Sequence, residues 1–389
     1  MTVSDEPLRI AIIAGEASGD HLGGPLMREI FRRMSAEVEF FGIGGADMTA
    51  AGLNSIFPMS EIAVMSPLEI LRRLPSLFRR IRQTVDAIID WAPDVLVIID
   101  CPEFSHRVAS RVRARRPRLP IVDYVAPSVW AWRPWRAKSM NSYIDEVMAV
   151  LPFEPDVYVR LGGPRCRYVG HAAGERPSAD PEMVARPREQ TSSGGPVLVV
   201  MPGSRMNEIN RLMAPFGDAV TRLTALAPTM GVVIPVLPHT KAVVERAVEN
   251  WLVKPLIVTD EAERHAAMAA GDAAIVASGT ATLELALAET PMVVGYRADL
   301  VPAWAVKYLL SVKSIVLANL VHETNVVTEL IQSHCTGERL AETVWPLLSD
   351  TPQRRDHMAA LVEISRKVRS PGKSPSAAAA DIVLEAAGR

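Results

Sequence analysis

The sequence predicts an α/β protein with two Rossmann-like domains, and three observations support this. Short apolar runs alternate with helical periodicity along most of the chain, as in parallel α/β folds. The alternation stops over 171–196, a stretch rich in Pro, Gly, Ser and charge, and then restarts. The length of 389 residues suits two domains of ordinary size. We expect an N-terminal domain at 1–170, a linker at 171–196 with a short helix as an option, a C-terminal domain at 197–365 and a terminal helix at 366–389. The sequence leaves open whether the terminal helix packs against the first domain.

In the first half, apolar runs lead into polar or glycine-bearing turns. Residues 8–14 are typical of a buried strand, and residues 21–34 carry a helical period after the turn at 15–20. The run at 95–99 is wholly apolar and ends in Asp100. Further strands are expected at 38–43, 121–125 and 147–151, and a further helix at 67–91.

The second half repeats the alternation. Strands are expected at 197–201, 231–235, 256–258, 273–276 and 292–296, and an alanine-rich helix within 370–389. Open α/β sheets bind ligands outside the carboxyl ends of their strands. Functional residues are therefore expected in the turns that follow the strands.

Composition excludes several classes of protein. A formal net charge of −2 gives no reason to expect a nucleic acid partner. The three cysteines lie far apart, so neither a disulfide framework nor a zinc site is expected. The polar N-terminus does not resemble a signal peptide, and no apolar run approaches the roughly 18 residues that span a bilayer. Separated cysteines fit a reducing cytoplasm best. Dinucleotide, P-loop, H-E-x-x-H and D-x-D motifs are missing, so we expect no metal or other cofactor.

Two strand-to-helix turns in the second half suit phosphate. Backbone N–H groups at a helix start, together with the positive end of the helix dipole, favour an anion. Two such turns, with Arg205 as an added cation, predict a bound diphosphate and hence a nucleotide-linked substrate. Glu284 follows the second turn and is a candidate for the ribose hydroxyls, the alternative being a surface glutamate. The residues of the two turns are Gly203, Ser204 and Arg205, and Ser278, Gly279, Thr280 and Ala281.

The first half supplies candidates for acid–base chemistry. Asp100 lies at the carboxyl end of an apolar strand, where it suits a general base; the alternative is a cap for the next element. The turn at 15–20 offers small residues that let a ligand approach the backbone, and Ser18 or Asp20 suits a helix cap. His21 is a second candidate base, although a lone histidine at a helix start is more often structural.

Two segments have a composition that suits a membrane surface. The loop at 128–135 holds three of the seven tryptophans beside two arginines, and the segment 68–82 is basic and apolar at near-helical spacing. The alternatives are an aromatic corner packed inside the protein and an ordinary amphipathic core helix. The membrane-facing candidates are Trp130, Trp132 and Arg133 in the loop, and Leu71, Arg72, Phe78 and Arg79 in the segment.

Taken together, these motifs resemble the lipid-A-disaccharide synthase family. The resemblance is spread over most of the chain, and the combination of G-E-A-S-G-D with P-S-V-W-A-W-R is highly specific. The strings that carry it are A-G-E-A-S-G-D at 14–20, A-V-M at 63–65, P-D-V at 93–95, Y-V-A-P-S-V-W-A-W-R at 124–133, L-P-F-E at 151–154, P-G-S-R at 202–205, A-S-G-T-A-T-L-E at 277–284 and P-M-V-V-G-Y-R at 291–297.

The resemblance implies an inverting glycosyltransferase of GT-B fold. The family transfers 2,3-diacylglucosamine from its UDP-linked form to 2,3-diacylglucosamine 1-phosphate, lipid X. The products are a β-1,6-linked disaccharide 1-phosphate and UDP. Because both substrates carry acyl chains, the resemblance implies peripheral attachment to the inner face of the cytoplasmic membrane. The oligomeric state is left open, with a homodimer as one option.

The resemblance also implies roles for individual positions. Asp100 is the expected base, the two turns at 203–205 and 278–281 face the diphosphate, and Glu284 contacts ribose. The remaining implied contacts are Asn319 and Gln332 on the donor side, and Gly15, Ser18, Gly19 and Asp20 on the acceptor side.

Some positions depart from the family pattern. Glu103 and Ser105 replace Asp and Asn, Ala318 and Thr328 replace prolines, and A-A-G-E at 172–175 lacks the usual proline and aspartate. Two alternatives therefore stay open. One is another GT-B enzyme, such as an undecaprenyl-linked sugar transferase or a UDP-sugar epimerase. The other is a relative that binds lipid or nucleotide without turnover.

Overall fold

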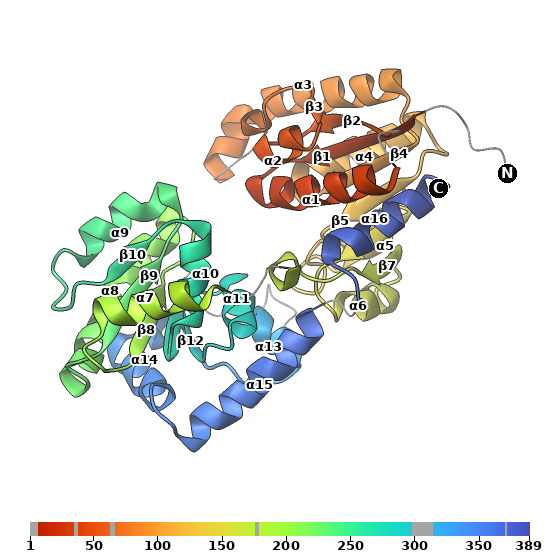
Figure 1. Cartoon of the computed structure of the whole chain (residues 1–389). Coiled ribbons are helices and arrows are strands. Elements are labelled where there is room, and N and C mark those ends of the chain that lie inside the picture. Colours follow the sequence, from red (N-terminus) through yellow and green to blue (C-terminus); the bar gives the residue numbers. More distant parts are fainter. Residues whose placement is uncertain (1–6, 35–37, 63–66, 176–178, 298–313, 370–371) are drawn as a thin grey trace. The chain divides into compact units, whose positions relative to one another are not determined.

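The structure is a computed structural model that describes residues 7–34, 38–62, 67–175, 179–297, 314–369 and 372–389, with side chains of the helix at 67–91 described from residue 75. The chain forms two compact units, Met1–Glu175 with Ser370–Arg389, and Arg176–Arg369. Each unit has one sheet flanked by helices, and every described strand pair is parallel, which confirms the α/β class (Figure 1).

The first unit has a seven-stranded sheet in the order β3-β2-β1-β4-β5-β6-β7. Its strands are β1 (Leu8–Ala14), β2 (Val38–Ile43), β3 (Asn54–Ser55), β4 (Val95–Ile99), β5 (Ile121–Tyr124), β6 (Glu146–Ala149) and β7 (Arg165–Tyr168). Its helices are α1 (Ala17–Met34), α2 (Ala46–Ala50), α3 (Pro67–Trp91), α4 (Pro102–Arg115), α5 (Trp135–Met140), α6 (Glu154–Arg160) and α16 (Pro375–Ala386), with short 3₁₀ turns at Met59–Glu61 and Ala172–Glu175.

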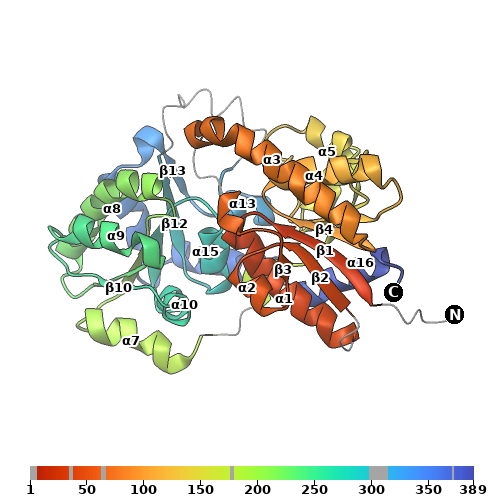
Figure 2. The ribbon, with the colours of Figure 1, turned by 90° about the horizontal axis from the view of Figure 1, so that it is seen from above.

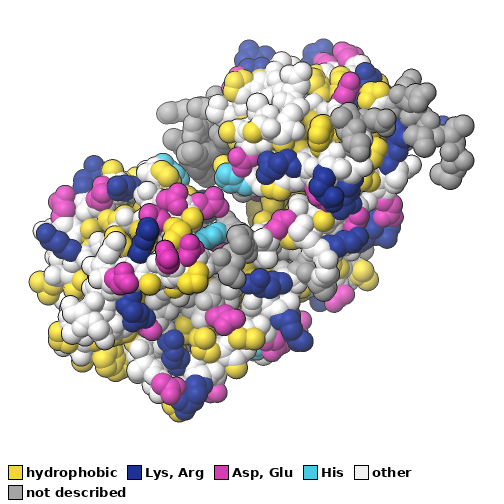
Figure 3. Space-filling model, viewed as in Figure 1, with side chains coloured by type: hydrophobic (Ala, Val, Ile, Leu, Met, Phe, Trp, Pro, Cys, Tyr) yellow, Lys and Arg dark blue, Asp and Glu magenta, His cyan; other side chains and the backbone are white. Residues whose placement is uncertain are grey.

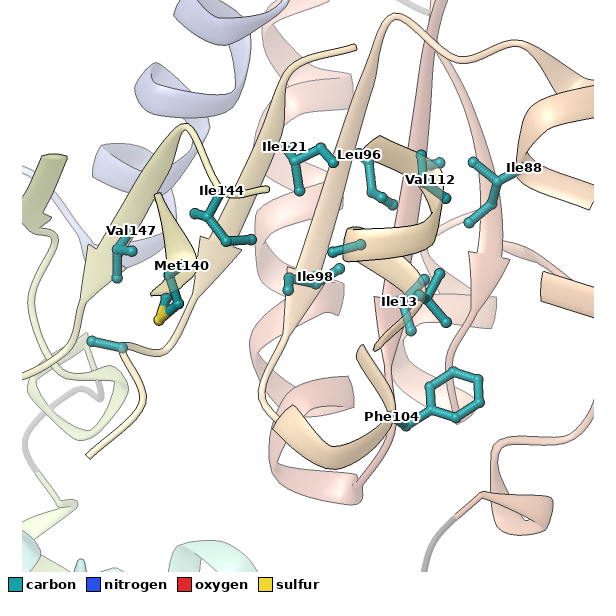
Figure 4. Close-up of a cluster of buried hydrophobic side chains, with 14 of the residues drawn as sticks. Ile13, Ile88, Leu96, Ile98, Phe104, Val112, Ile121, Met140, Ile144 and Val147 are labelled. Carbon is teal, nitrogen blue, oxygen red and sulfur yellow. The ribbon is translucent and has the colours of Figure 1, made fainter. Parts of the chain in front are cut away.

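Apolar side chains cover both faces of this sheet. Helices α3 and α4 lie on one face and α1 and α16 on the other (Figure 2). On the α4 face, Leu96 and Ile98 of β4 face Phe104 and Val112 of α4 (Figure 4). A strand that is buried on both faces has an apolar sequence throughout, and β4 is such a strand.

The second unit has a six-stranded sheet in the order β10-β9-β8-β11-β12-β13. Its strands are β8 (Val197–Met201), β9 (Gly231–Pro235), β10 (Leu256–Val258), β11 (Ala273–Val276), β12 (Met292–Tyr296) and β13 (Glu329–Ile331). Its helices are α7 (Pro181–Thr191), α8 (Met206–Leu226), α9 (Lys241–Val248), α10 (Glu261–Ala269), α11 (Ala281–Leu287), α13 (Leu317–His322), α14 (Gly337–Val344) and α15 (Pro352–Val368), with 3₁₀ turns at Pro238–Thr240, Gln332–His334 and Trp345–Leu347. One core cluster lies between this sheet and helices α8, α9 and α14.

One element differs from the sequence expectation. Helix α1 begins at Ala17, four residues before the expected start, because Asp20 N–H already bonds to the Glu16 carbonyl at 3.1 Å. The stretch expected to be a linker contains the short helix α7, which Asp180 caps and which packs on β9 and α10. The terminal helix α16, whose packing the sequence leaves open, packs on α1 and belongs to the first unit.

Candidate active site

The sequence-predicted turns lie where the strand order of each sheet reverses. In the first unit β1 lies between β2 and β4, and Ala14 pairs with Ile99, so the turn at 15–20 lies beside Asp100. In the second unit Met201 pairs with Val276, so the turns after β8 and β11 are neighbours. Open α/β sheets bind ligands at such switch points.

Asp100 and Ser18 are joined by a hydrogen bond. Ser18 Oγ donates to Asp100 Oδ2 at 3.0 Å, and Cys101 N–H donates to Asp100 Oδ1 at 2.8 Å. Asp100 and Cys101 have φ angles of 51° and 49°, which turn the chain sharply from β4 into α4. Left-handed backbone is uncommon outside glycine and often marks functional sites. The half-buried carboxylate is thus fixed at the carboxyl edge of the sheet, as a general base should be.

The close approach of these two turns depends on glycine. A Cβ on Gly15 would lie 2.5 Å from Cys101 Sγ, and a Cβ on Gly19 would lie 3.3 Å from the Ile99 carbonyl oxygen. Either added group would push the start of α1 away from β4. These glycines therefore position Ser18 against the carboxylate.

Asp20 and His21 have partners other than Asp100. Asp20 is buried, and its carboxylate accepts hydrogen bonds from the N–H groups of Gly45, Asp47 and Met48 at 2.8 to 3.0 Å. Asp20 therefore anchors the start of α2, which favours a structural role, and its expected place on the acceptor side stays a prediction. His21 Nδ1 lies 2.5 Å from Asp47 Oδ2 on the exposed surface, which favours the structural alternative for this histidine.

A pocket of about 140 Å³ lies beside Asp100. The polar side chains in its wall include those of His106, Arg133 and Arg136, together with the backbone of 125–129. His106 is only 5% exposed; its Nε2 lies 3.2 Å from Asp123 Oδ2, and its Nδ1 lies 3.1 Å from the Tyr143 hydroxyl. The imidazole is therefore held from both of its nitrogens.

The tryptophan loop is divided between packed and exposed indoles. Trp130 donates from Nε1 to Glu154 Oε1 at 3.0 Å and packs edge-on against Phe153. These contacts hold the indole on the body of the unit and favour the packed alternative for this residue, whose membrane-facing role stays a prediction. Trp132 is 46% and Trp135 69% exposed, and the Arg133 guanidinium stacks 4.1 Å from the Trp132 ring.

Helix α3 is a core helix with a solvated face over its described side chains. Ile81, Val85 and Ile88 are buried against the sheet, whereas Phe78 and Arg79 are exposed. The buried side chains fit the amphipathic-core alternative, while Phe78 and Arg79 are exposed and their membrane-facing role stays a prediction. The side chains of the candidates Leu71 and Arg72 lie outside the described residues.

The first phosphate turn leads into the long helix α8. Gly203 has a φ of 106°, and a Cβ there would lie 2.5 Å from Glu208 Oε2, so this position needs glycine. Arg205 is the N-cap residue of α8 and has an exposed side chain, with Nη1 3.3 Å from Glu208 Oε1. The carbonyl of Ser204 lies 3.3 Å from His239 Nε2. The helix start thus presents backbone donors beside an exposed guanidinium.

The second phosphate turn is tied into its own unit. Ser278 Oγ donates to the Ile315 carbonyl at 2.7 Å, so its hydroxyl serves the loop before α13. Gly279 has a φ of 154°, and no atom lies within 4 Å of an added Cβ, so the turn is open on that side. Thr280 occupies the N-cap position of α11, which begins at Ala281, without a capping bond from its side chain. Glu284, half-buried, follows on the same helix.

The two remaining donor-side candidates differ. Asn319 is 2% exposed; its amide donates to the Val327 carbonyl at 2.8 Å and to Glu329 Oε1 at 3.0 Å, and its carbonyl accepts from Val327 N–H. Asn319 therefore holds the loop before β13, and its expected place on the donor side stays a prediction. Gln332 lies at the carboxyl end of β13 with a φ of 53°, and its donor-side contact stays a prediction.

The sequence analysis missed three groups that the structure places at these sites. His106 and Arg136 line the pocket beside Asp100, and Glu208 closes the capping box of α8. Glu208 could have been found, because an acid three residues after a cap is a known start signal. His106 lies on α4 one helical turn beyond Asp100, which was the available signal for it.

No helix among the described residues is long and apolar enough to cross a membrane. Within the same residues, no cluster of His, Cys, Asp and Glu has the arrangement of a metal site. Basic and acidic side chains are interspersed on the face drawn in Figure 3, as a net charge of −2 suggests.

The fold is shared with enzymes that act on sugars. A glycotransferase of kitacinnamycin matches with a TM-score of 0.64 and 18% identity, over 98% of this chain and 99% of that chain. A putative UDP-N-acetylglucosamine 2-epimerase from Listeria monocytogenes matches with a TM-score of 0.62 and 12% identity, over 97% and 95%. Fold and paired turns define a protein of the GT-B class, and the fold alone does not separate a transferase from an epimerase.

Sequence similarity separates a transferase from an epimerase. The family model described as lipid-A-disaccharide synthetase matches residues 10–383. Lipid-A-disaccharide synthases of Nitrobacter hamburgensis and Rhodopseudomonas palustris are each 46% identical to the chain, over 99% and 97% of it and 97% and 95% of their own lengths. The chain belongs to the lipid-A-disaccharide synthase family and is a glycosyltransferase with that activity, so the epimerase and non-catalytic alternatives are set aside.

Proposed function

We propose that the chain transfers 2,3-diacylglucosamine from UDP-2,3-diacylglucosamine to the 6-hydroxyl of lipid X, with inversion. The observation that supports this is the Ser18–Asp100 hydrogen bond at the switch point of the first sheet. Asp100 takes the hydroxyl proton as the acceptor oxygen bonds to the anomeric carbon and the bond from that carbon to UDP breaks. One displacement of this kind converts an α-linked donor into a β-linked product.

The departing UDP needs its charge neutralised. We assign this to the second unit, where Arg205 stands at the amino-terminal end of α8, a helix of 21 residues. Helix N-termini and guanidinium groups stabilise developing phosphate charge. The turn at 278–281 and Glu284 are assigned to the same nucleotide.

The test is a metal-free assay with EDTA, UDP-2,3-diacylglucosamine and lipid X in neutral detergent micelles. We expect disaccharide 1-phosphate and UDP to form together. Asp100→Asn should lower kcat by at least a thousandfold because the base is lost, while UDP affinity stays within twofold. An unchanged rate would remove Asp100 as the base, and loss of UDP binding in the wild type would contradict the role of the two turns.

We further propose peripheral attachment of the first unit to an anionic, cytoplasm-facing membrane through its tryptophan loop. Trp132 and Trp135 are the exposed indoles, and Arg133 stacks on the first of them. Amphipathic indoles beside a cation suit the headgroup region. Replacing both indoles by alanine should weaken sedimentation with anionic vesicles at least fivefold. Trp345→Ala in the second unit, where the indole is 40% exposed, is the matched control and should have no effect.

A further inference from the structure

The pocket beside Asp100 contains more positive than negative side chains. Its described lining includes two guanidinium groups, those of Arg133 and Arg136, and one carboxylate, that of Asp100. Outside the pocket these arginines share a single counter-ion: Glu103 lies 3.7 Å from Arg133 and 3.8 Å from Arg136.

Glu103 is also the partner of a third arginine. Arg107 lies 2.9 Å from its carboxylate, a shorter distance than that of either pocket arginine. Three guanidinium groups therefore surround one acid, and the two pocket arginines keep donor capacity for an anion. Arg136 also donates to the Pro102 carbonyl at 3.3 Å, which fixes it close to the start of α4.

The polar groups in the wall of the pocket are positioned by their neighbours. The buried His106 is hydrogen-bonded to Tyr143 and lies 3.2 Å from the buried Asp123 carboxylate, which has no hydrogen-bond partner among the described residues. The Arg136 side chain is 19% exposed, and the exposed Arg133 is braced on the Trp132 ring. Side chains that are already ordered lose little entropy when a ligand binds.

We propose that Arg133 and Arg136, with His106 in the pocket wall, bind the phosphomonoester of the acceptor. The inference rests on the proposed function, which places the acceptor hydroxyl at Asp100. A dianionic phosphate and planar guanidinium groups form paired, charge-assisted hydrogen bonds. Holding the phosphate at one end of the sugar orients its hydroxyl toward Asp100. The pocket thereby selects a phosphorylated acceptor over a neutral one.

The experiment compares lipid X with its 1-O-methyl analogue, which lacks the phosphate, in neutral detergent without phospholipid. The wild type should favour lipid X in kcat/KM and in equilibrium binding without donor. Arg136→Gln should lower kcat/KM for lipid X about 10- to 100-fold, since a hydrogen bond to a charged group is lost. The same variant should leave the methyl analogue and the donor KM within about twofold.

Arg107→Gln is the matched control, because Arg107 shares Glu103 but does not line the pocket. It should leave the preference for lipid X unchanged. Equal losses on both acceptors in Arg136→Gln, or an effect seen only when anionic phospholipid is added, would overturn the phosphate site. Equal binding of the two acceptors by the wild type would overturn it even without turnover. Absence of product from either acceptor, with lipid X still preferred in binding, would count against the proposed reaction instead.

Discussion

At the scale of residues, the active-site carboxylate depends on an unusual backbone. Asp100 and Cys101 are both left-handed, at a cost of about 1–2 kcal/mol each. Local hydrogen bonds offset this cost: Ser105 Oγ donates to the Asp100 carbonyl at 2.7 Å, and Asp100 N–H donates to the Tyr124 carbonyl at 3.1 Å. As a result, the backbone leaves the strand at Asp100 and the carboxylate faces Ser18.

Ser18→Ala tests that orientation. The variant removes the hydroxyl that donates to Asp100 Oδ2, so the base loses one of its two positioning donors. We expect kcat to fall about tenfold, the size of one hydrogen bond to a charged group, with donor KM unchanged. In the Asp100→Asn background the same change should add no further loss, because the two residues act together. Additive losses in this double-mutant cycle would separate Ser18 from the base.

Glu154 gives the first unit a pH-dependent stability. Its carboxylate accepts from Trp130 Nε1 and from the N–H groups of Val150 and Leu151. Burial outweighs these bonds and raises the pKa of Glu154 from 4.5 to about 7. When the pKa of a group is higher in the folded than in the unfolded state, the group contributes stability that is fully present below its unfolded-state pKa. That stability is lost as the pH rises through its folded-state pKa.

Glu154→Gln should remove this dependence. Between pH 5 and pH 8 the unfolding free energy of the wild type, relative to the variant, should fall by about 3 kcal/mol. Urea unfolding followed by tryptophan fluorescence at several pH values measures the difference. A difference that stays flat or grows with pH would contradict the raised pKa.

From the sequence, the place of a residue in the fold is easier to predict than the groups that its side chain contacts. Asp100 and Ser18 were predicted because a strand end and a small-residue turn are visible in the chain. Asp20 and Asn319 also have partners inside the protein that no local sequence pattern reveals: backbone N–H groups for Asp20, and the Val327 backbone and the Glu329 side chain for Asn319. The same is true of Trp130, whose partner Glu154 lies 24 residues away.

At the scale of elements, both candidate sites are strand-turn-helix units, and their positions followed from periodicity. The exact start of α1 did not follow from periodicity, because its first hydrogen bond is accepted by the Glu16 carbonyl and not by a capping side chain. A short helix within 171–196 was left as an option, but the charges and prolines of this stretch hid its bounds, although Pro181 begins α7, where proline is favourable.

The start of α8 supports a prediction on nucleotide binding. Arg205→Gln removes the exposed cation at this helix end, so UDP affinity should fall about tenfold, as expected for a lost charge-assisted contact. Affinity for uridine, which lacks the diphosphate, should not change. Arg222→Gln is the control, because that arginine lies on the same helix and pairs with Asp218. Titration calorimetry with both ligands measures the effect; equal losses for UDP and uridine would place Arg205 away from the phosphates.

At the scale of the whole molecule, the chain crosses between its units twice, near residue 176 and near residue 370. The second crossing returns α16 to the first unit, where Arg33 binds Asp381 at 2.5 Å and Arg167 binds Glu385 at 2.7 Å. The sequence showed the helix but not its destination, because an alanine-rich helix fits many surfaces. The first unit therefore depends on residues from both ends of the chain.

Val383→Ala tests this dependence. Val383 is fully buried in the core that α16 shares with β1 and α1, so losing two methyl groups should lower the unfolding free energy of the first unit by about 2 kcal/mol. Val362→Ala on α15, where the side chain is 50% exposed, is the matched control and should change it by less than about 0.5 kcal/mol. Calorimetry should show the loss in the transition of the first unit, with UDP affinity of the second unit unchanged. A stability loss confined to the UDP-stabilised transition would instead assign α16 to the second unit.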